Sequence, residues 1–433
     1  MRLHGSLPSP VSHPSYAACR DQSAGIERLG VGSTHSPRFD SGATAPDPGN
    51  KLLIGKIRHL VREKGRITFA EFMEMALYDP EHGYYTSGHD RVGPRGDYLT
   101  SPAMHPVFGA MAGRWLAGNW AELGSPETFH IVEMGAGKGL LCASILSYLR
   151  DFLPELYSAA HYLVVEKSDP HPRETIARLC GPVTEELSHK LHVLSSLSEL
   201  PDAGIIGCFL SNELADSFPV HLVTVAEGRL KEIYVTIDGD EFTEEIAEPS
   251  TPGIPRYFER LGIRLPEGYR TEVNLRAPDW TREVGAKLAK GFALTIDYGY
   301  RAEEYYSPER RGGTLVCYYR HAYSEHPYVR VGRQDITAHV DFTSLMDAGR
   351  AAGLETVFYT TQREFLLEQG IENWLRQMEK SDIPAQQKRS ERRAVLALLD
   401  PRGMGRFRVL GQKKEMQRKA GFHRRLSTDS QLA

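Results

Sequence analysis

The sharpest chemical signal in the sequence is a glycine-rich turn that lies between an apolar run and a helical stretch, Glu133-Met134-Gly135-Ala136-Gly137-Lys138-Gly139-Leu140. Glycines at such a turn let backbone N–H groups approach a ligand at the N-terminus of the next helix, where anionic and polar groups are favoured. A Walker phosphate loop needs Ser or Thr after Gly-Lys, and the chain has Gly139 there, so that reading fails. A dinucleotide fingerprint needs a glycine at position 140; Leu140 weakens it without excluding it. The turn therefore predicts a nucleotide-like cofactor held by Glu133, Gly135, Gly137 and Gly139.

An acid at the end of the next apolar run fits the same cofactor. Glu166 ends the run His161-Tyr162-Leu163-Val164-Val165. A carboxylate at this place in a Rossmann-like sheet accepts hydrogen bonds from both hydroxyls of a ribose. The glycine turn and Glu166 together do not separate the adenosine of S-adenosylmethionine from that of NAD.

A polar segment, Ser211–Val220, follows a third apolar run. Asn212 offers amide donors and a carbonyl acceptor to a cofactor, and Glu213 can hold a cation or take its proton. Side chains at the carboxyl ends of such strands line the crevice where ligands bind. A helix N-cap explains the same residues equally well. Both interpretations stay open from these residues alone.

Two further segments are polar. The loop Gly93–Pro102 contains Thr100 and Ser101, which we assign to cofactor binding. The segment Gln334–Phe342 contains His339, a candidate proton acceptor, although a lone histidine is more often a hydrogen-bonded structural residue.

These residues need an alternation of strands and helices to bring them together. Apolar runs at 129–134, 161–166, 205–210 and 292–297 alternate with helical stretches such as 139–149, which predicts a parallel sheet covered on both faces. A last strand is expected at 407–410. Thr68 and Glu71 form the pattern of a capping box that opens a helix through Leu77. Between about 220 and 290, alternating residues, Asp-Gly and many prolines predict a β-rich insertion.

We expect six segments: a disordered tail (1–50), a helical and loop segment (51–125), the first part of the core (126–221), the insertion (222–290), the rest of the core (291–422) and a short tail (423–433). The first 50 residues lack the apolar core of a secretory signal, and they contain too many acids for a mitochondrial presequence.

Composition excludes several classes of protein. The chain has 433 residues, 41% hydrophobic and 25% charged, which excludes a wholly disordered chain and a coiled coil. The formal net charge of −4 argues against a dedicated nucleic-acid binder. No apolar run is long enough to span a bilayer. The basic stretch after Ile371 is interrupted by Leu398-Leu399-Asp400-Pro401, which favours a solvated helix face. The five cysteines are widely spaced and form no C-x-x-C pair, so we expect neither a disulfide framework nor a metal site.

The motifs together resemble the MidA-like family of S-adenosylmethionine-dependent methyltransferases, relatives of the mitochondrial arginine methyltransferase needed for respiratory complex I assembly. The resemblance covers about 51–422 and rests on Thr68-Phe69-Ala70-Glu71-Phe72-Met73, Ala76-Leu77-Tyr78-Asp79-Pro80, Gly83-Tyr84-Tyr85, Gly96-Asp97-Tyr98-Leu99-Thr100-Ser101-Pro102, Glu133-Met134-Gly135-Ala136-Gly137, Ser211-Asn212-Glu213-Leu214, Asp297-Tyr298-Gly299 and Asp335-Ile336-Thr337-Ala338-His339-Val340. The sequence departs from the family pattern at Ala215 and Ser217.

The resemblance implies a doubly wound, mostly parallel, seven-stranded class I methyltransferase (Rossmann-like) α/β sheet, with S-adenosyl-L-methionine as the methyl donor. It implies direct displacement onto a nitrogen of a protein arginine, which carboxylates must hold and polarise. Glu213 is the first candidate for this role and Glu272 the second. Two other classes remain alternatives: an NAD-dependent oxidoreductase, and a non-catalytic assembly factor that retains the cofactor fold.

The expected partner is a protein substrate such as a respiratory complex I subunit, with no nucleic acid and no membrane span. We expect the cytoplasm of a bacterium, or the mitochondrial matrix if the source is eukaryotic, and prefer the bacterial compartment.

Overall fold

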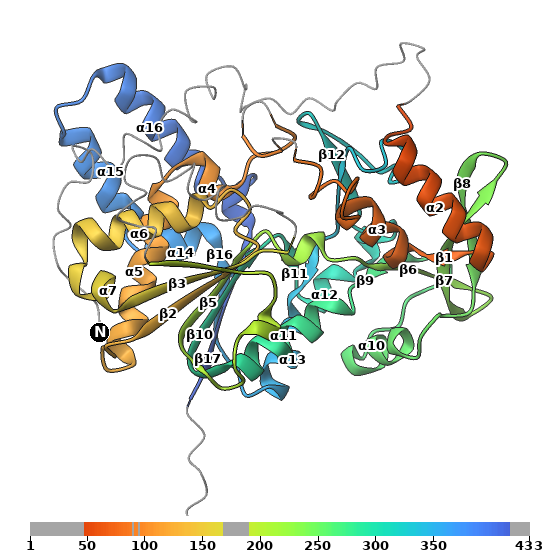
Figure 1. Cartoon of the computed structure of the whole chain (residues 1–433), viewed down its shortest axis with the longest axis horizontal. Coiled ribbons are helices and arrows are strands. Elements are labelled where there is room, and N and C mark those ends of the chain that lie inside the picture. The colour runs from red at the N-terminus through yellow and green to blue at the C-terminus, as the bar shows by residue number, and fades with distance from the viewer. Residues whose placement is uncertain (1–46, 89–90, 94–95, 168–189, 416–433) are drawn as a thin grey trace, which may run out of the picture.

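A seven-stranded sheet forms the left half of the molecule in Figure 1. The computed structural model describes residues 47–88, 91–93, 96–167 and 190–415. The strands lie side by side in the order β16 (Glu355–Thr361), β17 (Arg408–Lys414), β10 (Leu288–Asp297), β5 (Ile205–Asn212), β2 (Phe129–Met134), β3 (Ala160–Val165) and β4 (Leu191–Leu194).

The sheet is mixed. Strands β10, β5, β2, β3 and β4 pair in parallel, whereas β17 is antiparallel to both of its neighbours, β10 and β16. The fold is therefore α/β with a mostly parallel sheet, as the alternation of strands and helices predicts.

Helices cover both faces of this sheet because alternate side chains of each strand point to opposite sides. On β2, Phe129 and Ile131 belong to the core beneath α5 (Val107–Glu122) and α6 (Leu140–Phe152). Val132 and Met134 belong to a second core that includes Val284 of α11 (Arg276–Lys287). The helix α13 (Phe342–Ala351) packs with α11 over β17.

A smaller antiparallel sheet forms the right half of the molecule, with α2 (Lys51–Lys64) and α3 (Phe69–Tyr78) packed against it (Figure 1). Its strands are β1 (Ile67–Thr68), β6 (His221–Ala226), β7 (Arg229–Asp238), β8 (Glu241–Ala247) and β9 (Arg270–Val273). The segment predicted to be a β-rich insertion supplies all of these strands except β1. It also contains α10 (Gly253–Leu261), α11 and the beginning of β10, so the second sheet ends at Val273 rather than at Lys290.

The N-terminal helices begin where their capping residues predict. The Thr68 side chain accepts a hydrogen bond from the Glu71 N–H and the Glu71 carboxylate accepts one from the Thr68 N–H, which confirms the capping box. Asn50 caps α2 by accepting from two backbone N–H groups. Residues 47–50, assigned to the tail, contact the fold, since Asp47 pairs with Arg333. The rest of the predicted tail, 1–46, lies outside the described residues.

The described chain contains further helices, 3₁₀ turns and strands with the following bounds. The helices are α4 (Ser101–Met104), α7 (Pro154–Ala159), α12 (Ala302–Tyr305), α14 (Gln362–Glu368), α15 (Ile371–Lys380) and α16 (Ala385–Leu398), with 3₁₀ turns η4 (Leu197–Glu199), η5 (Ala215–Ser217), η6 (Pro308–Arg310) and η7 (Met404–Arg406). The remaining strands are β11 (Gly299–Tyr300), β12 (Val316–Tyr319), β13 (Ala322–Ser324), β14 (Asp335–Thr337) and β15 (Val340–Asp341).

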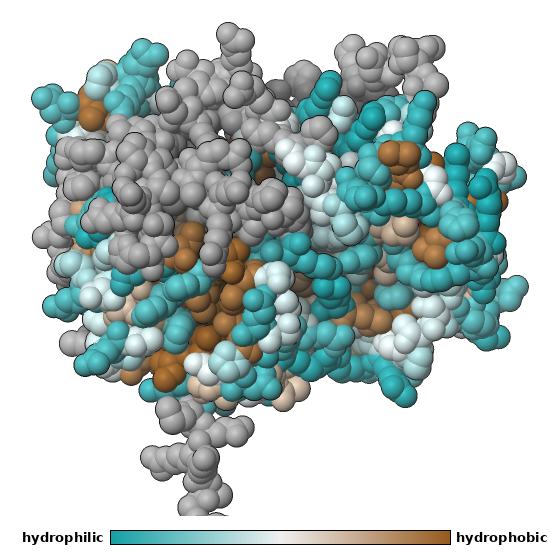
Figure 2. All heavy atoms as spheres, in the orientation of Figure 1, coloured by the Kyte–Doolittle hydropathy of each residue, from teal (hydrophilic) through white to brown (hydrophobic). Residues whose placement is uncertain are grey.

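The distribution of hydrophobic side chains and the free state of the described cysteines agree with an ordinary globular composition. Figure 2 shows hydrophobic side chains gathered over the main sheet on the face in view, with hydrophilic side chains over most of the rest. Cys142, Cys208 and Cys317 are buried free thiols, while Cys19 and Cys180 lie outside the described residues. Within the described ranges, no helix is long and apolar enough to cross a membrane.

Candidate active site

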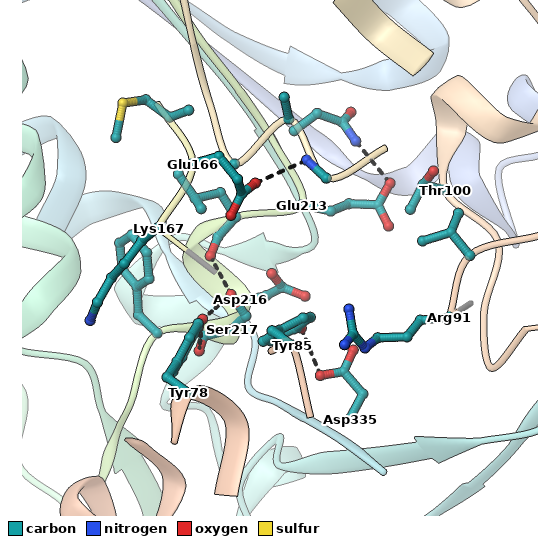
Figure 3. A pocket seen from close by; sticks show the side chains of 18 of the residues that line it. Tyr78, Tyr85, Arg91, Thr100, Glu166, Lys167, Glu213, Asp216, Ser217 and Asp335 are labelled. Carbon is teal, nitrogen blue, oxygen red and sulfur yellow. Dashed lines mark hydrogen bonds between the residues drawn. The ribbon is translucent and has the colours of Figure 1, made fainter. Parts of the chain in front are cut away.

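A cavity of about 1600 Å³ lies at the carboxyl ends of the main-sheet strands. The turns that follow β2, β3, β5 and β10 supply one wall, and the chain around Tyr78, Tyr85 and Tyr98 supplies the other. Figure 3 shows Glu166, Glu213, Asp216 and Asp335 around a shared space. Ligands of open α/β sheets bind at this edge, so the fold places the candidate residues where a ligand belongs.

The glycine turn forms one end of the cavity. Gly135, Gly137 and Gly139 all have positive φ values, 68°, 53° and 75°, which glycine adopts without strain. A Cβ atom built on Gly137 meets no atom within 4 Å, so this residue borders open space. The helix α6 begins at Leu140, and none of the described side chains caps its N-terminus. Its first N–H groups are therefore available to a bound polar group.

Two predicted carboxylates flank this turn. Glu166 lies one residue beyond β3, and its Oε2 accepts a hydrogen bond from the Gly137 N–H at 3.1 Å. Glu133 lies within β2 and accepts a hydrogen bond from the Tyr162 hydroxyl at 2.6 Å. Burial raises the pKa of Glu133 to about 7, and the nearby Glu166 charge adds to the shift.

Glu213 stands at the end of β5 in a left-handed conformation, with φ of 51°. Its backbone N–H donates to the Ile296 carbonyl oxygen at 2.8 Å, which fixes the turn to β10. Its Oε1 accepts hydrogen bonds from the Ser101 N–H at 3.2 Å and the Asn212 side-chain amide at 3.0 Å. Burial, followed by the Asp216 charge, raises the pKa of Glu213 to about 8. The side chain is therefore a half-buried acid–base group in the cavity wall. The helix-cap alternative does not describe it, because Leu214 occupies the N-cap position of η5.

The turn after Glu213 is held by a carboxylate from the next strand. Asp297 Oδ2 accepts hydrogen bonds from the backbone N–H groups of Leu214, Ala215 and Asp216 at 3.2, 3.0 and 3.4 Å. Burial, with the charges of Asp216 and Glu213 next, raises the pKa of Asp297 well above its usual range. This contact fixes the direction in which Glu213 and Asp216 enter the cavity.

Sequence reasoning gave no role to four residues that the structure places at the cavity. Asp216 and Asp335 are 4% and 3% exposed, and burial raises their pKa values to about 6 and about 7. The Tyr298 hydroxyl donates to Asp216, and the Tyr85 hydroxyl donates to Asp335 at 2.7 Å. Tyr85, Tyr298 and Asp335 lie in motifs that carry the family resemblance, and Asp216 lies two residues after one of them. Nothing in the sequence indicates contact between Tyr85 and Asp335, however, because 250 positions separate them.

The structure does not bring two of the predicted catalytic residues into the cavity. Glu272 is 2% exposed and binds the backbone of Thr314 and Leu315 together with the Tyr305 hydroxyl. The His339 ring makes an edge-on contact with Tyr298 and a tilted contact with Tyr300. Burial lowers the pKa of His339 to about 4, so the ring is neutral. Neither Glu272 nor His339 is among the described residues that line the cavity. The structure therefore does not support these two roles, because the sequence indicates burial but not which cavity a buried side chain faces.

Two predicted cofactor residues, Ser101 and Gly139, do not themselves line the cavity. Ser101 is fully buried and contacts the site only through the N–H that it donates to Glu213, while its hydroxyl donates to Gln362. Gly139 shapes the turn without lining the cavity, whereas Thr100, Asn212, Gly135 and Gly137 line it.

Comparison with known proteins identifies the family. Residues 111–360 match the model of a family described as "Putative S-adenosyl-L-methionine-dependent methyltransferase". The chain belongs to this methyltransferase family. A COG1565 superfamily protein from Burkholderia thailandensis, crystallised bound to S-adenosyl-homocysteine, is 32% identical; the match covers 87% of this chain and 96% of that one, with a TM-score of 0.78.

Curated relatives carry the name of protein arginine methyltransferase NDUFAF7, mitochondrial. The protein from Rattus norvegicus is 28% identical over 405 residues, which cover 88% of each chain. The Homo sapiens protein is 25% identical, with 89% of each chain covered. The resemblance to the MidA-like family is confirmed. The chain is an S-adenosylmethionine-dependent methyltransferase, and neither the oxidoreductase nor the non-catalytic alternative is favoured.

Proposed function

We propose that this methyltransferase transfers the methyl group to a side-chain nitrogen of arginine in a protein. The names of the mitochondrial relatives support this substrate. The observation that carries the proposal is Glu213, a half-buried carboxyl with a raised pKa that lines the cavity. An arginine nitrogen must lose a proton when it is methylated, and a carboxylate within reach can receive it.

The residues around the glycine turn fit the cofactor. Gly137 borders open space that a Cβ atom would enter. The buried Asn212 Oδ1 has no hydrogen-bond partner in the described part of the chain. We assign the ribose hydroxyls to Glu166, and the adenine and amino-acid ends to the neighbourhood of Asn212, Thr100 and the turn. S-adenosylmethionine supplies an electrophilic methyl group on a positively charged sulfur when it is bound.

The protein's own groups then act by position and charge. The buried wall excludes water from the reacting atoms, and a fixed acceptor avoids the entropy cost of alignment. The Ser101 N–H and the Asn212 amide both reach Glu213 Oε1. They hold the carboxyl in one orientation and leave Oε2 without a donor among the described residues. In this proposal the positive charges of the bound substrate and cofactor lower the pKa of Glu213, and the ionised Oε2 receives the proton from the methylated nitrogen.

The test is mass spectrometry of methylated proteins. A lysate from cells that lack this protein is incubated with the purified protein and S-adenosylmethionine that carries a deuterated methyl group. The expected result is deuterated methyl on arginine side chains, which disappears when the protein is omitted. Label confined to lysine, carboxyl or non-protein molecules would refute the arginine assignment.

The finer assignments belong to the same proposal. The strand order and the single antiparallel strand support a doubly wound class I sheet. We keep the division into tail, helical segment, core and insertion, with the site residues Glu133, Glu166 and Glu213 in the core. A respiratory complex I subunit is the proposed kind of protein substrate. The higher identity to the Burkholderia protein than to the mitochondrial relatives supports a bacterial cytoplasmic location.

A further inference from the structure

Two buried aspartates of the cavity wall each receive a tyrosine hydroxyl and belong to neither the glycine turn nor Glu213. Asp216 lies in η5 and Asp335 begins β14. Asp216 Oδ2 accepts from Tyr298, but Asp216 Oδ1 is buried and has no hydrogen-bond partner within the described ranges. A buried carboxylate oxygen without a donor costs free energy. The geometry therefore calls for a donor that enters from the cavity.

The charge of this wall favours a cationic donor. Asp216, Asp335 and Glu213 influence one another, since after burial the Asp216 charge is the next cause that raises the pKa of both other groups. Carboxylates that repel one another in a buried site are stabilised by a cation between them. In Figure 3, Glu213 and Asp216 lie between Glu166, beside the glycine turn, and Asp335 at the other end of the view.

The tyrosines beside Asp335 already accommodate a guanidinium group. The Arg91 guanidinium lies 5.1 Å from the ring centre of Tyr84 and 5.7 Å from that of Tyr85. A guanidinium is planar, stacks on aromatic rings and offers five donors in a fixed fork, whereas a lysine ammonium is a compact, strongly hydrated point charge. Two carboxylates on separate elements with aromatic rings around them suit the planar cation.

We propose that Asp216 and Asp335 form the acceptor subsite of this enzyme and bind the substrate arginine as a guanidinium, with Tyr298 and Tyr85 orienting the two carboxylates. This inference rests on the proposed function and names the residues that would select its substrate. The bond between the acceptor nitrogen and the methyl carbon forms as the carbon–sulfur bond breaks, and its electron pair stays on sulfur. The proton of the methylated nitrogen passes to Glu213, so the product arginine keeps a single positive charge.

The experiment measures binding apart from methyl transfer. The probe is N-acetyl-L-arginine amide, titrated calorimetrically into the full chain saturated with S-adenosylhomocysteine, with the N-acetyl-lysine and N-acetyl-citrulline amides as comparisons. Citrulline keeps the shape of arginine and lacks the charge. We expect arginine to bind at least tenfold more tightly than either. Asp216→Asn and Asp335→Asn should each weaken arginine binding at least tenfold and leave S-adenosylhomocysteine affinity within twofold.

A matched control is available in the same chain. Asp341 is also a buried aspartate that accepts a hydrogen bond from a tyrosine, Tyr257 at 2.6 Å, but it does not line the cavity. Asp341→Asn should leave arginine binding unchanged. Tyr85→Phe and Tyr298→Phe serve if an aspartate variant fails to fold, and we expect each to weaken arginine binding severalfold.

Equal binding of arginine and lysine, no binding of the arginine probe, or unchanged binding in the subsite variants would overturn the subsite. If the wild-type protein binds the probe as expected but labels no arginine in the lysate, the proposed function fails and the subsite stands. If it labels arginine and the variants label as efficiently, the subsite fails and the function stands.

Discussion

Glu213→Gln separates a catalytic role for this carboxyl from a structural one. Both of its hydrogen-bond donors reach the same oxygen, Oε1. The glutamine carbonyl oxygen can accept from both, so the variant keeps the shape and the contacts. It removes only the ability to become an anion and to receive a proton. We expect cofactor affinity to stay within twofold and methyl transfer to fall by roughly a hundredfold or more, the usual loss for a positioned acid–base group.

The same variant should stabilise the protein. The pKa of Glu213 is raised from its ordinary 4.5 to about 8 in the fold. A carboxyl whose pKa is raised by folding is favourable below the unfolded value and costs increasing free energy as the pH rises toward the folded value. At about 1.4 kcal/mol per pH unit above 4.5, the cost at pH 7 is about 3 kcal/mol. Glutamine carries no such cost, because it is neutral in both states.

The assay compares melting temperatures of wild type and Glu213→Gln without cofactor at pH 5 and pH 8, together with turnover. We expect the two proteins to melt nearly together at pH 5 and the variant to melt higher at pH 8. Glu355→Gln is the control, since Glu355 is exposed at the start of β16, and it should show no pH-dependent gain. A variant that melts lower than wild type at pH 8, or that turns over at the wild-type rate, would refute the assignment of Glu213 as a buried proton acceptor.

The remaining predictions concern the cofactor and the fold. Gly137→Ala should weaken S-adenosylmethionine binding by at least tenfold in calorimetry, whereas Gly228→Ala, with φ of 69° and equally open space, should not; equal affinities would remove the turn from the cofactor site. Glu166→Ala should weaken cofactor affinity tenfold to a hundredfold with little change in turnover at saturation, because a hydrogen bond to a charged group contributes about 1.5–3 kcal/mol; normal binding with lost turnover would contradict the ribose role. Asn50→Ala should lower the stability by about 1 kcal/mol through the lost helix cap, measured by urea unfolding, and an unchanged midpoint would show that the cap is dispensable. Glu272→Gln should destabilise the protein at neutral pH while kcat changes little, because both Glu272 oxygens accept hydrogen bonds and the amide NH2 would face N–H donors; a large kcat loss in a stable variant would support a catalytic role.

Five strands of the main sheet could be predicted from the sequence because most of their residues are buried. The edge strands β4 and β16 were not predicted, since their residues are half-buried or exposed. The run Phe129–Met134 is continuous and apolar apart from His130 and Glu133, and the predicted strand agrees with β2 at both ends. The glycine turn follows from it, since a strand, three alternate glycines and a helix leave few conformations. Local signals of this kind also located Glu166 and Asn212 at the cavity.

The acceptor wall could not be predicted in this way because its parts come from distant segments. Tyr85 follows α3, Asp216 belongs to η5 and Asp335 begins β14, so only the packing of the two sheets brings them to one cavity. A short-range pattern contains no information about such contacts. The placement of His339 has the same origin. His339 follows Asp335 closely in the sequence, yet its ring packs against Tyr298 and does not line the cavity.

Glu272 and Glu213 show which property of a buried acid indicates catalysis. Glu272 is buried and Glu213 is half-buried, and desolvation raises the pKa of both. The oxygens of Glu272 accept from the Thr314 N–H and hydroxyl, the Leu315 N–H and the Tyr305 hydroxyl, so every side of that carboxyl is occupied by the protein. The two donors of Glu213 instead share Oε1, and the side chain lines the cavity. A carboxyl that the fold has saturated stabilises the fold, whereas one that keeps an acceptor for the cavity is available to a substrate. Burial and a shifted pKa are therefore insufficient evidence for catalysis, and the unused acceptor capacity of Glu213 distinguishes it from Glu272.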